Sequence, residues 1–91
     1  MENTNTNYEF LHNDGKWYPI EIRKCSQTAR TRGTVNWGKP YQIVYIKDGK
    51  EHPIRYRRAS IEAALMELQN TVEYGDGVGN GNRYRAAVHP E

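Results

Sequence analysis

The sequence predicts an α+β fold, in which a small antiparallel sheet of three to four strands carries one C-terminal helix packed on one face and a flexible Gly-rich tail. Three observations predict this fold. An Asp-Gly pair at 48–49 separates two runs rich in β-branched and aromatic residues, as in a two-residue hairpin. An earlier stretch, 17–23, alternates between two faces as a half-buried strand does. Between 61 and 72, apolar residues recur at the spacing of one helix face.

The turn at 48–49 sets the register of a hairpin over 41–58, because a two-residue loop fixes which residues lie opposite each other. Counting outward predicts the pairs Lys47–Lys50, Ile46–Glu51, Tyr45–His52, Val44–Pro53, Ile43–Ile54, Gln42–Arg55 and Tyr41–Tyr56. One face then carries Tyr41, Ile43, Tyr45, Ile54 and Tyr56, and the other carries Gln42, Val44, Ile46, Pro53, Arg55 and Arg57. We expect the tyrosine face to lie beneath the helix, and the face with the arginines to be exposed.

A second hairpin is predicted upstream, with strands at 8–11 and 17–23 joined by a turn at 12–16. Residues 1–7 are polar and rich in Asn and Thr, and we expect them to be disordered. Proline cannot donate a hydrogen bond to a neighbouring strand, so it favours the edge of a sheet. Pro19 and Pro53 therefore predict that strands 17–23 and 51–57 lie outside, with 8–11 and 41–46 in the centre.

One helix is predicted over 60–74, with Ser60 as its N-cap and Gly75 after its last turn. Its apolar stripe consists of Ile61, Ala64, Leu65, Leu68 and Val72. Glycines alternate from 75 to 81, so we expect 75–91 to be a flexible tail. The chain is thus expected to form a single domain over 8–74, with a long basic loop at 24–40.

Composition limits the classes of function. The 91 residues include 13 Lys and Arg against 11 Asp and Glu, a formal net charge of +2, which is too small for a histone-like protein. The charge is segregated, because 24–40 contains basic but no acidic residues. A lone cysteine, Cys25, excludes an internal disulfide and a Cys-rich zinc site. The first residues do not resemble a signal peptide and no long apolar run occurs, so we expect a cytoplasmic protein without a membrane partner.

Basic residues with an aromatic residue among them form the predicted binding site. Its members are Arg23, Lys24, Arg30, Arg32, Trp37, Lys39, Arg55, Arg57 and Arg58. The cations would neutralise phosphates, and Trp37 would stack on a base or anchor the loop. Such cations can equally serve only to keep a sheet face soluble and unpaired. The tyrosine face could be a base-stacking platform, but core packing is the better interpretation because the helix stripe must cover an apolar face.

A sheet followed by an Ala/Glu-rich helix, with Gly15-Lys16-Trp17 and Ile20-Glu21-Ile22-Arg23, resembles small three-stranded DNA-binding domains. The plant ethylene-response type and the arm-site-binding domain of tyrosine recombinases are examples. The resemblance implies a sheet that reads the major groove. The long basic loop and the extra strand depart from that pattern.

Catalysis is not predicted. Cys25 and three histidines, His12, His52 and His89, could supply a nucleophile and a base, but no pattern links them. The histidines lack the spacing of metal ligands, and the Gly-rich segment follows a helix without the Gly-Lys-Ser/Thr of a phosphate loop. We therefore expect no enzyme activity, no metal and no cofactor.

Two functions remain open. The first is a non-catalytic nucleic-acid-binding module that uses the basic sheet face and loop, with DNA ahead of RNA as the partner. The alternative is a small inhibitor or adaptor, of the kind that phages and other mobile elements encode, which covers a host nucleic-acid enzyme. In either case strand 51–57 could add to a partner's sheet or pair with a second copy of the chain.

Overall fold

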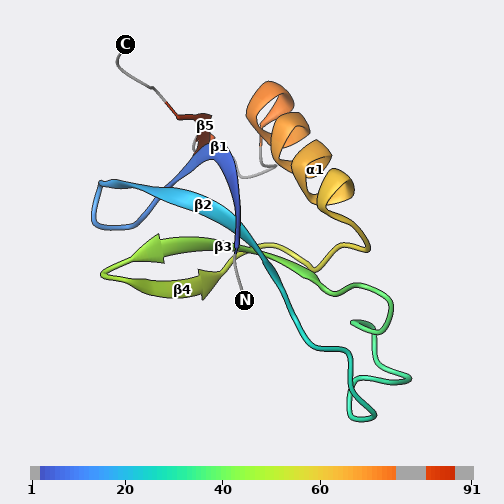
Figure 1. The fold of residues 1–91 in the computed structure, drawn as a ribbon. Helices are drawn as coiled ribbons and strands as arrows, with labels where there is room; N and C mark the ends of the chain where they lie inside the picture. The colour runs from blue at the N-terminus through green and yellow to red at the C-terminus, as the bar shows by residue number, and fades with distance from the viewer. Residues whose placement is uncertain (1–2, 76–81, 88–91) are drawn as a thin grey trace.

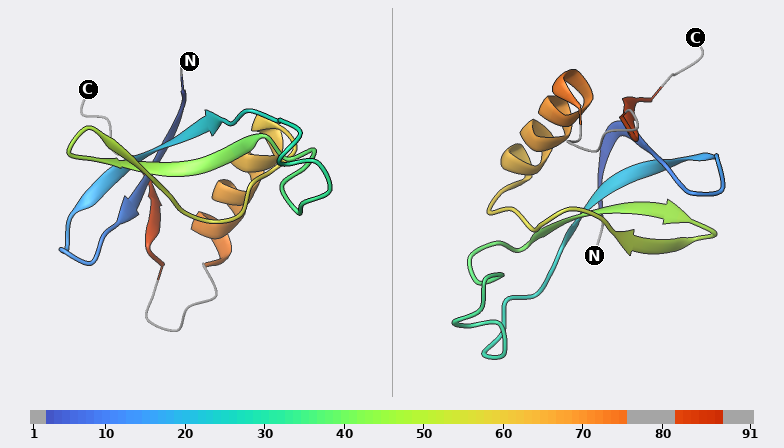
Figure 2. Two further views of the ribbon diagram at one scale, coloured as in Figure 1. Left: turned by 90° about the horizontal axis from the view of Figure 1, so that it is seen from below. Right: turned by 180° about the vertical axis from the view of Figure 1, so that it is seen from behind.

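The computed structural model describes residues 3–75 and 82–87, which form five strands and one helix (Figure 1). The elements in chain order are β1 (Thr4–Leu11), β2 (Trp17–Lys24), β3 (Tyr41–Lys47), β4 (Lys50–Pro53), α1 (Ile61–Tyr74) and β5 (Tyr84–Ala86). All strand pairs are antiparallel, in the order β4-β3-β2-β1-β5. Figure 2 shows α1 on one face of this sheet, with 25–40 extending beyond the sheet's end. The α+β class is as predicted, and the sheet has one strand more than expected.

The strand order corrects one prediction from the prolines. β4 lies at an edge of the sheet, as Pro53 predicts, but β2 lies in the middle between β1 and β3. The β2–β3 ladder starts at Ile20, one residue after Pro19. Pro19 therefore sits where only β1 pairs with β2, so the central strand loses no β3 hydrogen bond to it.

The β3–β4 hairpin has the predicted register near its turn. Asp48 and Gly49 have φ values of 54° and 74°, as a turn of this kind requires. The paired residues are Lys47–Lys50, Ile46–Glu51, Tyr45–His52 and Val44–Pro53. The next pair is also in place, because the Ile54 N–H donates to the Ile43 carbonyl over 2.9 Å.

Beyond Ile54 the predicted register is wrong, because the chain forms a bulge. Tyr41 pairs with Arg58 rather than Tyr56, which inserts two residues opposite Gln42. Arg55 adopts a left-handed φ of 63°. The buried Gln42 side chain occupies the bulge, and its amide nitrogen donates to the carbonyls of Ile43, Ile54 and Arg55 over 3.0, 3.2 and 2.9 Å. Two of these bonds satisfy the Ile54 and Arg55 carbonyls, which the broken ladder leaves without a strand partner.

A similar bulge bends β1. The β1–β2 register shifts between Asn5 and Glu9, and Asn7 has a φ of 61°. The buried Thr6 hydroxyl donates to the Ile20 carbonyl of β2 over 2.6 Å, so a polar side chain again replaces missing ladder bonds. Residues 4–7, which we expected to be disordered, therefore form the first half of β1. Residues 1–2 lie outside the described part of the chain.

The helix has the predicted bounds and caps. The Ser60 hydroxyl accepts a hydrogen bond from the Ala63 N–H over 3.0 Å. At the other end Gly75 has a φ of 93°, a value that side chains disfavour, and its N–H donates to Thr71.

The expected tail contains a strand. Tyr84, Arg85 and Ala86 form β5, which pairs with β1 and makes the other edge of the sheet. Asn82 ties its start to the helix, because the side-chain amide donates to the Thr71 carbonyl over 2.7 Å. The rest of the predicted tail, 76–81 and 88–91, lies outside the described residues.

The core lies between α1 and the sheet. Its buried members are Ile20, Ile22, Ile43, Ala64, Leu68 and Tyr84, and the partly buried Tyr8, Phe10, Tyr41, Tyr45, Ile54, Ile61, Leu65 and Val72 pack against them. This confirms that the helix stripe meets the tyrosine face of the hairpin. Tyr56 is the exception: it is 83% exposed, because the bulge removes it from that face.

On the opposite face, Val44 is fully buried although we expected that face to be exposed. Glu21 lies beside Val44 in β2, and Glu51 comes from β4 on the other side of β3. The Asn3 amide donates to both carboxylates, and Arg23 lies 3.5 Å from Glu51. These contacts run across β3 where Val44 lies, so this face is a polar network rather than open solvent.

Replacing Gln42 with Ala should lower the free energy of unfolding by about 1–3 kcal/mol, because the Ile54 and Arg55 carbonyls would lose their donor. Urea unfolding followed by circular dichroism measures this loss. Gln69→Ala, at an exposed helix position, is the control and should change stability by less than about 0.5 kcal/mol. A Gln42→Ala loss no larger than that of the control would contradict this role.

Candidate nucleic-acid interface

The structure separates the nine predicted site residues into two groups. Arg23, Arg55 and Arg58 pair with carboxylates of the same chain. The other cations form no ion pair with any carboxylate among the described residues, and they are Lys24, Arg30, Arg32, Lys39 and Arg57. The ninth residue, Trp37, is 46% exposed.

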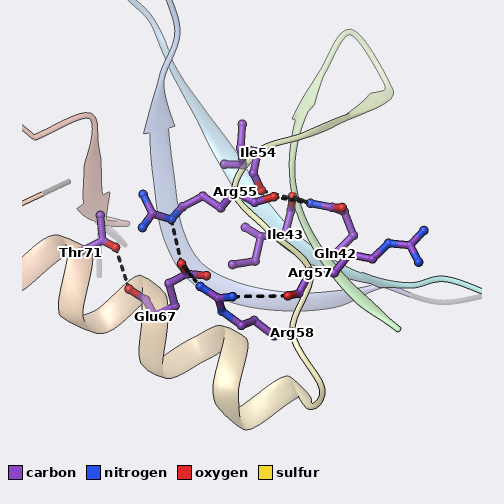
Figure 3. Close-up of polar contacts among 8 residues, drawn as sticks. All are labelled: Gln42, Ile43, Ile54, Arg55, Arg57, Arg58, Glu67 and Thr71. Carbon is purple, nitrogen blue, oxygen red and sulfur yellow. Dashed lines mark hydrogen bonds and ion pairs between the residues drawn. The ribbon is translucent and has the colours of Figure 1, made fainter. Parts of the chain in front are cut away.

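Glu67 of α1 holds two of the paired arginines (Figure 3). Its Oε1 accepts from Arg55 Nε over 3.2 Å and from Arg58 Nη2 over 2.5 Å. The Arg55 guanidinium also lies over the ring of Tyr84, 5.5 Å from its centre. Burial lowers the pKa of Arg55, but Tyr84 and Glu67 outweigh that effect and the net shift is upward. Both arginines therefore connect the segment after β4 to the helix.

The predicted basic sheet face is not assembled. Arg55 was expected beside Arg57, but its left-handed backbone turns it to the helix side, and Figure 3 shows Arg57 on the side away from Glu67. Arg23 is on the predicted face but contacts its own chain. Its pKa is raised chiefly by the Cys25 side chain, with a further contribution from Glu51. Of the three, Arg57 alone is left for a partner.

The loop at 25–40 has a defined backbone. Thr31, Thr34 and Trp37 each donate a backbone N–H to the carbonyl three residues earlier, over 3.0, 3.0 and 3.1 Å. The hydroxyls of Thr31 and Thr34 donate to the same carbonyls over 2.8 and 2.6 Å. These successive threonine turns span 28–37, and exposed Arg30 and Arg32 lie between the threonines. Local hydrogen bonds thus order a segment without a helix or strand.

Gln27 fixes the position of Trp37. Its amide nitrogen donates to the Asn36 carbonyl over 3.2 Å, and its oxygen accepts from the Gly38 N–H over 2.7 Å. The two bonds hold the residues on either side of Trp37. The Arg32 guanidinium lies 5.9 Å from the centre of the tryptophan ring, a cation–π distance.

A hollow joins this loop to the segment after β4. Its volume is about 300 Å³, and its lining consists of Val35, Asn36, Lys39, Tyr56, Arg57 and Arg58. None of these six residues is acidic, and the Tyr56 ring is largely exposed. The structure therefore brings Lys39 of the loop next to Arg57 and Arg58, which follow β4. We call these six residues the loop hollow.

Sequence reasoning missed Val35 and Tyr56 as parts of this surface. Val35 is a β-branched residue in a mostly polar loop, and such a residue is a sequence signal for a contact surface. The structure leaves it exposed. Tyr56 gave no such signal. Its alternation with Ile54 indicates a continuing strand, and only the bulge at Gln42 reverses that placement.

The residues considered for catalysis lie apart. Cys25 follows β2 and bonds through its backbone to Pro40, whereas His12 precedes β2 and contacts Asp14 and Tyr18. His52 stacks on Tyr45, with ring centres 4.9 Å apart. His89 is outside the described residues, among which no three His, Cys, Asp or Glu side chains are grouped as metal ligands would be.

The stacking-platform alternative is disfavoured by the same aromatic contacts. Tyr45 stacks on Phe10 as well as His52, each at 4.9 Å. Both faces of the Tyr45 ring are therefore occupied by neighbours, and a base would have to displace one of them.

Glu67→Gln should lower the free energy of unfolding by about 1–3 kcal/mol, because two guanidinium groups lose a carboxylate that is only 12% exposed. The loss should stay below that of a fully buried pair, since Arg55 and Arg58 keep 26% and 33% of their side chains exposed. Urea unfolding checks this, with Glu73→Gln on the exposed last turn as control. Equal stabilities of the two variants would show that Glu67 is not a structural link.

Comparison of the chain with protein-family models, with curated proteins and with solved structures found no significant match. The five-stranded sheet also differs from the three-stranded sheet that the sequence resemblance implies. The single helix of the described residues is too short and too polar to cross a membrane.

Proposed function

We propose that this protein is a non-catalytic module that binds nucleic acid, with DNA as the first candidate. The contact surface consists of Lys24, Arg30, Arg32, Lys39 and Arg57, with Trp37 and Tyr56 as exposed rings. One observation carries the proposal: five cations on or beside the loop have no acidic partner in the described chain, and three of them lie near exposed aromatic rings, with Arg32 at Trp37 and Lys39 and Arg57 at Tyr56. We call this set the loop surface.

The chemistry of the loop surface matches a polyanion better than a neutral ligand. Lysine and arginine neutralise phosphates and release counterions, and aromatic rings stack on bases. The surrounding 24–40 segment contains no acidic residue that would repel a phosphate. The helix carries exposed Glu62 and Glu73, so the charge is polarised within a molecule of formal charge +2. Such polarity orients an approaching polyanion toward the loop.

A second candidate function is binding to a protein. Val35 and Tyr56 are 84% and 83% exposed, and they line the same hollow as three cations. Exposed Trp, Tyr and Arg residues are the types that dominate protein–protein hot spots. An acidic partner, such as an enzyme that itself acts on nucleic acid, would use the same loop surface.

Pairing of a partner's strand with an edge of this sheet is less favourable than binding through the loop surface. In β4, only Glu51 and Pro53 point their backbone groups away from β3, because their pairs are the non-hydrogen-bonded ones. Proline has no N–H, so this edge offers one outward donor, at Glu51. The other edge, β5, is three residues long, and its Tyr84 N–H is bonded to Asn82.

Fluorescence anisotropy with labelled duplex and single-stranded DNA tests the proposal. Binding through five phosphate contacts should give a log–log salt slope of about −4.5 for duplex or −3.5 for single strands. The double variant Arg30→Ala/Arg32→Ala should weaken binding and reduce the magnitude of that slope by roughly 2. The free energy of unfolding should hardly change, because both side chains are exposed.

The matched control is Lys16→Ala/Lys50→Ala, which removes the same net charge at exposed positions near the two hairpin turns, at the other end of the sheet. Its affinity should stay close to that of the wild type. Absence of binding at low salt would refute the nucleic-acid proposal. Equal weakening by both double variants would refute the loop surface as the site.

A further inference from the structure

We infer that the loop hollow binds one phosphate of a single-stranded nucleic acid and that the adjacent base stacks on Tyr56. This inference rests on the proposed function and specifies the form of nucleic acid that the site prefers. Three features support it: the charges in the hollow, the position of Arg57 and the exposure of the Tyr56 ring.

The hollow is built for an anion. Its charged groups are Lys39, Arg57 and Arg58, and its other lining residues are neutral. Arg58 is already paired with Glu67, a carboxylate that it shares with Arg55. Lys39 and Arg57 have no such pair among the described residues. A phosphate between them would accept hydrogen bonds from the Lys39 ammonium and the Arg57 guanidinium, both of which are common phosphate-binding groups.

The fold places Arg57 at the hollow. The bulge bonded by Gln42 sends it to the side of the segment opposite Arg55 and Arg58 (Figure 3). Its Nη1 atom is buried and has no hydrogen-bond partner in the described part of the chain. A buried polar group of this kind is costly, because it has lost water without gaining a partner. An anion that pairs with the rest of this guanidinium would offset part of that cost.

Tyr56 supplies the preference for a single strand. Its ring is 83% exposed and lies in the wall of the same hollow. In a duplex, each base is already stacked on its neighbours, whereas a single strand can offer a base to a protein ring. Tyr45 cannot play this role, because Phe10 and His52 stack on it. Tyr56 is the aromatic residue that lines the loop hollow, and its ring is both open and next to unpaired cations.

The test compares two tyrosines of similar exposure. Tyr56→Ala removes the proposed stacking ring, and Tyr74→Ala removes a 79% exposed ring at the end of α1 as the matched control. Each variant is titrated with labelled oligothymidylate and with the corresponding duplex. Tyr56→Ala should weaken oligothymidylate binding by about 5- to 100-fold, with a smaller effect on the duplex. Tyr56→Phe keeps the ring and should bind as the wild type does.

Two further measurements separate stacking from phosphate binding. An abasic strand has the phosphates without the bases, so Tyr56→Ala should bind it as the wild type does. Arg57→Gln should weaken binding to the abasic and the normal strand alike, with urea unfolding confirming that the variant still folds. Weakening of the normal strand alone by Arg57→Gln would overturn the phosphate assignment.

The outcomes distinguish this inference from the proposed function. If the wild type binds DNA with the expected salt dependence but Tyr56→Ala binds oligothymidylate as tightly as Tyr74→Ala, the stacking inference is wrong and the proposed function stands. If the wild type binds neither strand form at low salt, both fail.

Discussion

The arrangement of this molecule depends on the buried side-chain amide of Gln42, whose hydrogen bonds replace those of the β3–β4 ladder beyond Ile54. Its nitrogen donates to the Ile54 and Arg55 carbonyls, so these two groups keep a hydrogen bond where the backbone leaves the sheet. Two residues are inserted there, and the three arginines that follow no longer alternate as in a strand. Arg55 and Arg58 meet Glu67 on the helix, and Arg57 faces the other way. The bulge thus puts two arginines in contact with the helix and a third in the loop hollow.

The first strand uses the same device. In β1, the buried Thr6 hydroxyl donates to the neighbouring strand where the register shifts. The next residue, Asn7, has a left-handed backbone, as Arg55 has in the other bulge. The bend lets one strand pair with β2 along its length and with β5 through its second half. A small core then suffices, because a strongly bent sheet surrounds much of the helix-facing apolar surface. Each of the two buried side chains is polar, yet each is needed for the shape of the apolar core.

Local signals in the sequence were sufficient for the turn at 48–49, the hairpin register as far as Ile54, both helix caps and the helix stripe. Each depends on residues close together in the chain, with a strong conformational preference. The two bulges were not predictable in this way, because Gln and Thr within a strand look like ordinary exposed residues until the fold buries them. β5 pairs three residues with a strand more than seventy positions away, and no local pattern marks that partner. The site shows the same division: the basic loop followed from composition, whereas the positions of Arg55 and Tyr56 depend on the bulge.

The threonine turns of the loop have a consequence for how its binding properties could change. Each turn closes on the backbone a few residues away, so the path of 28–37 is set by the threonines themselves, with Gln27 holding the end near Trp37. The side chains of Arg30, Arg32 and Val35 take no part in the hydrogen bonds of these turns. New side chains at those three positions could therefore alter what is recognised while the chain keeps its course. The loop is in this sense a display scaffold, and its threonine repeat could be transplanted between two strands of another sheet to present a different set of groups.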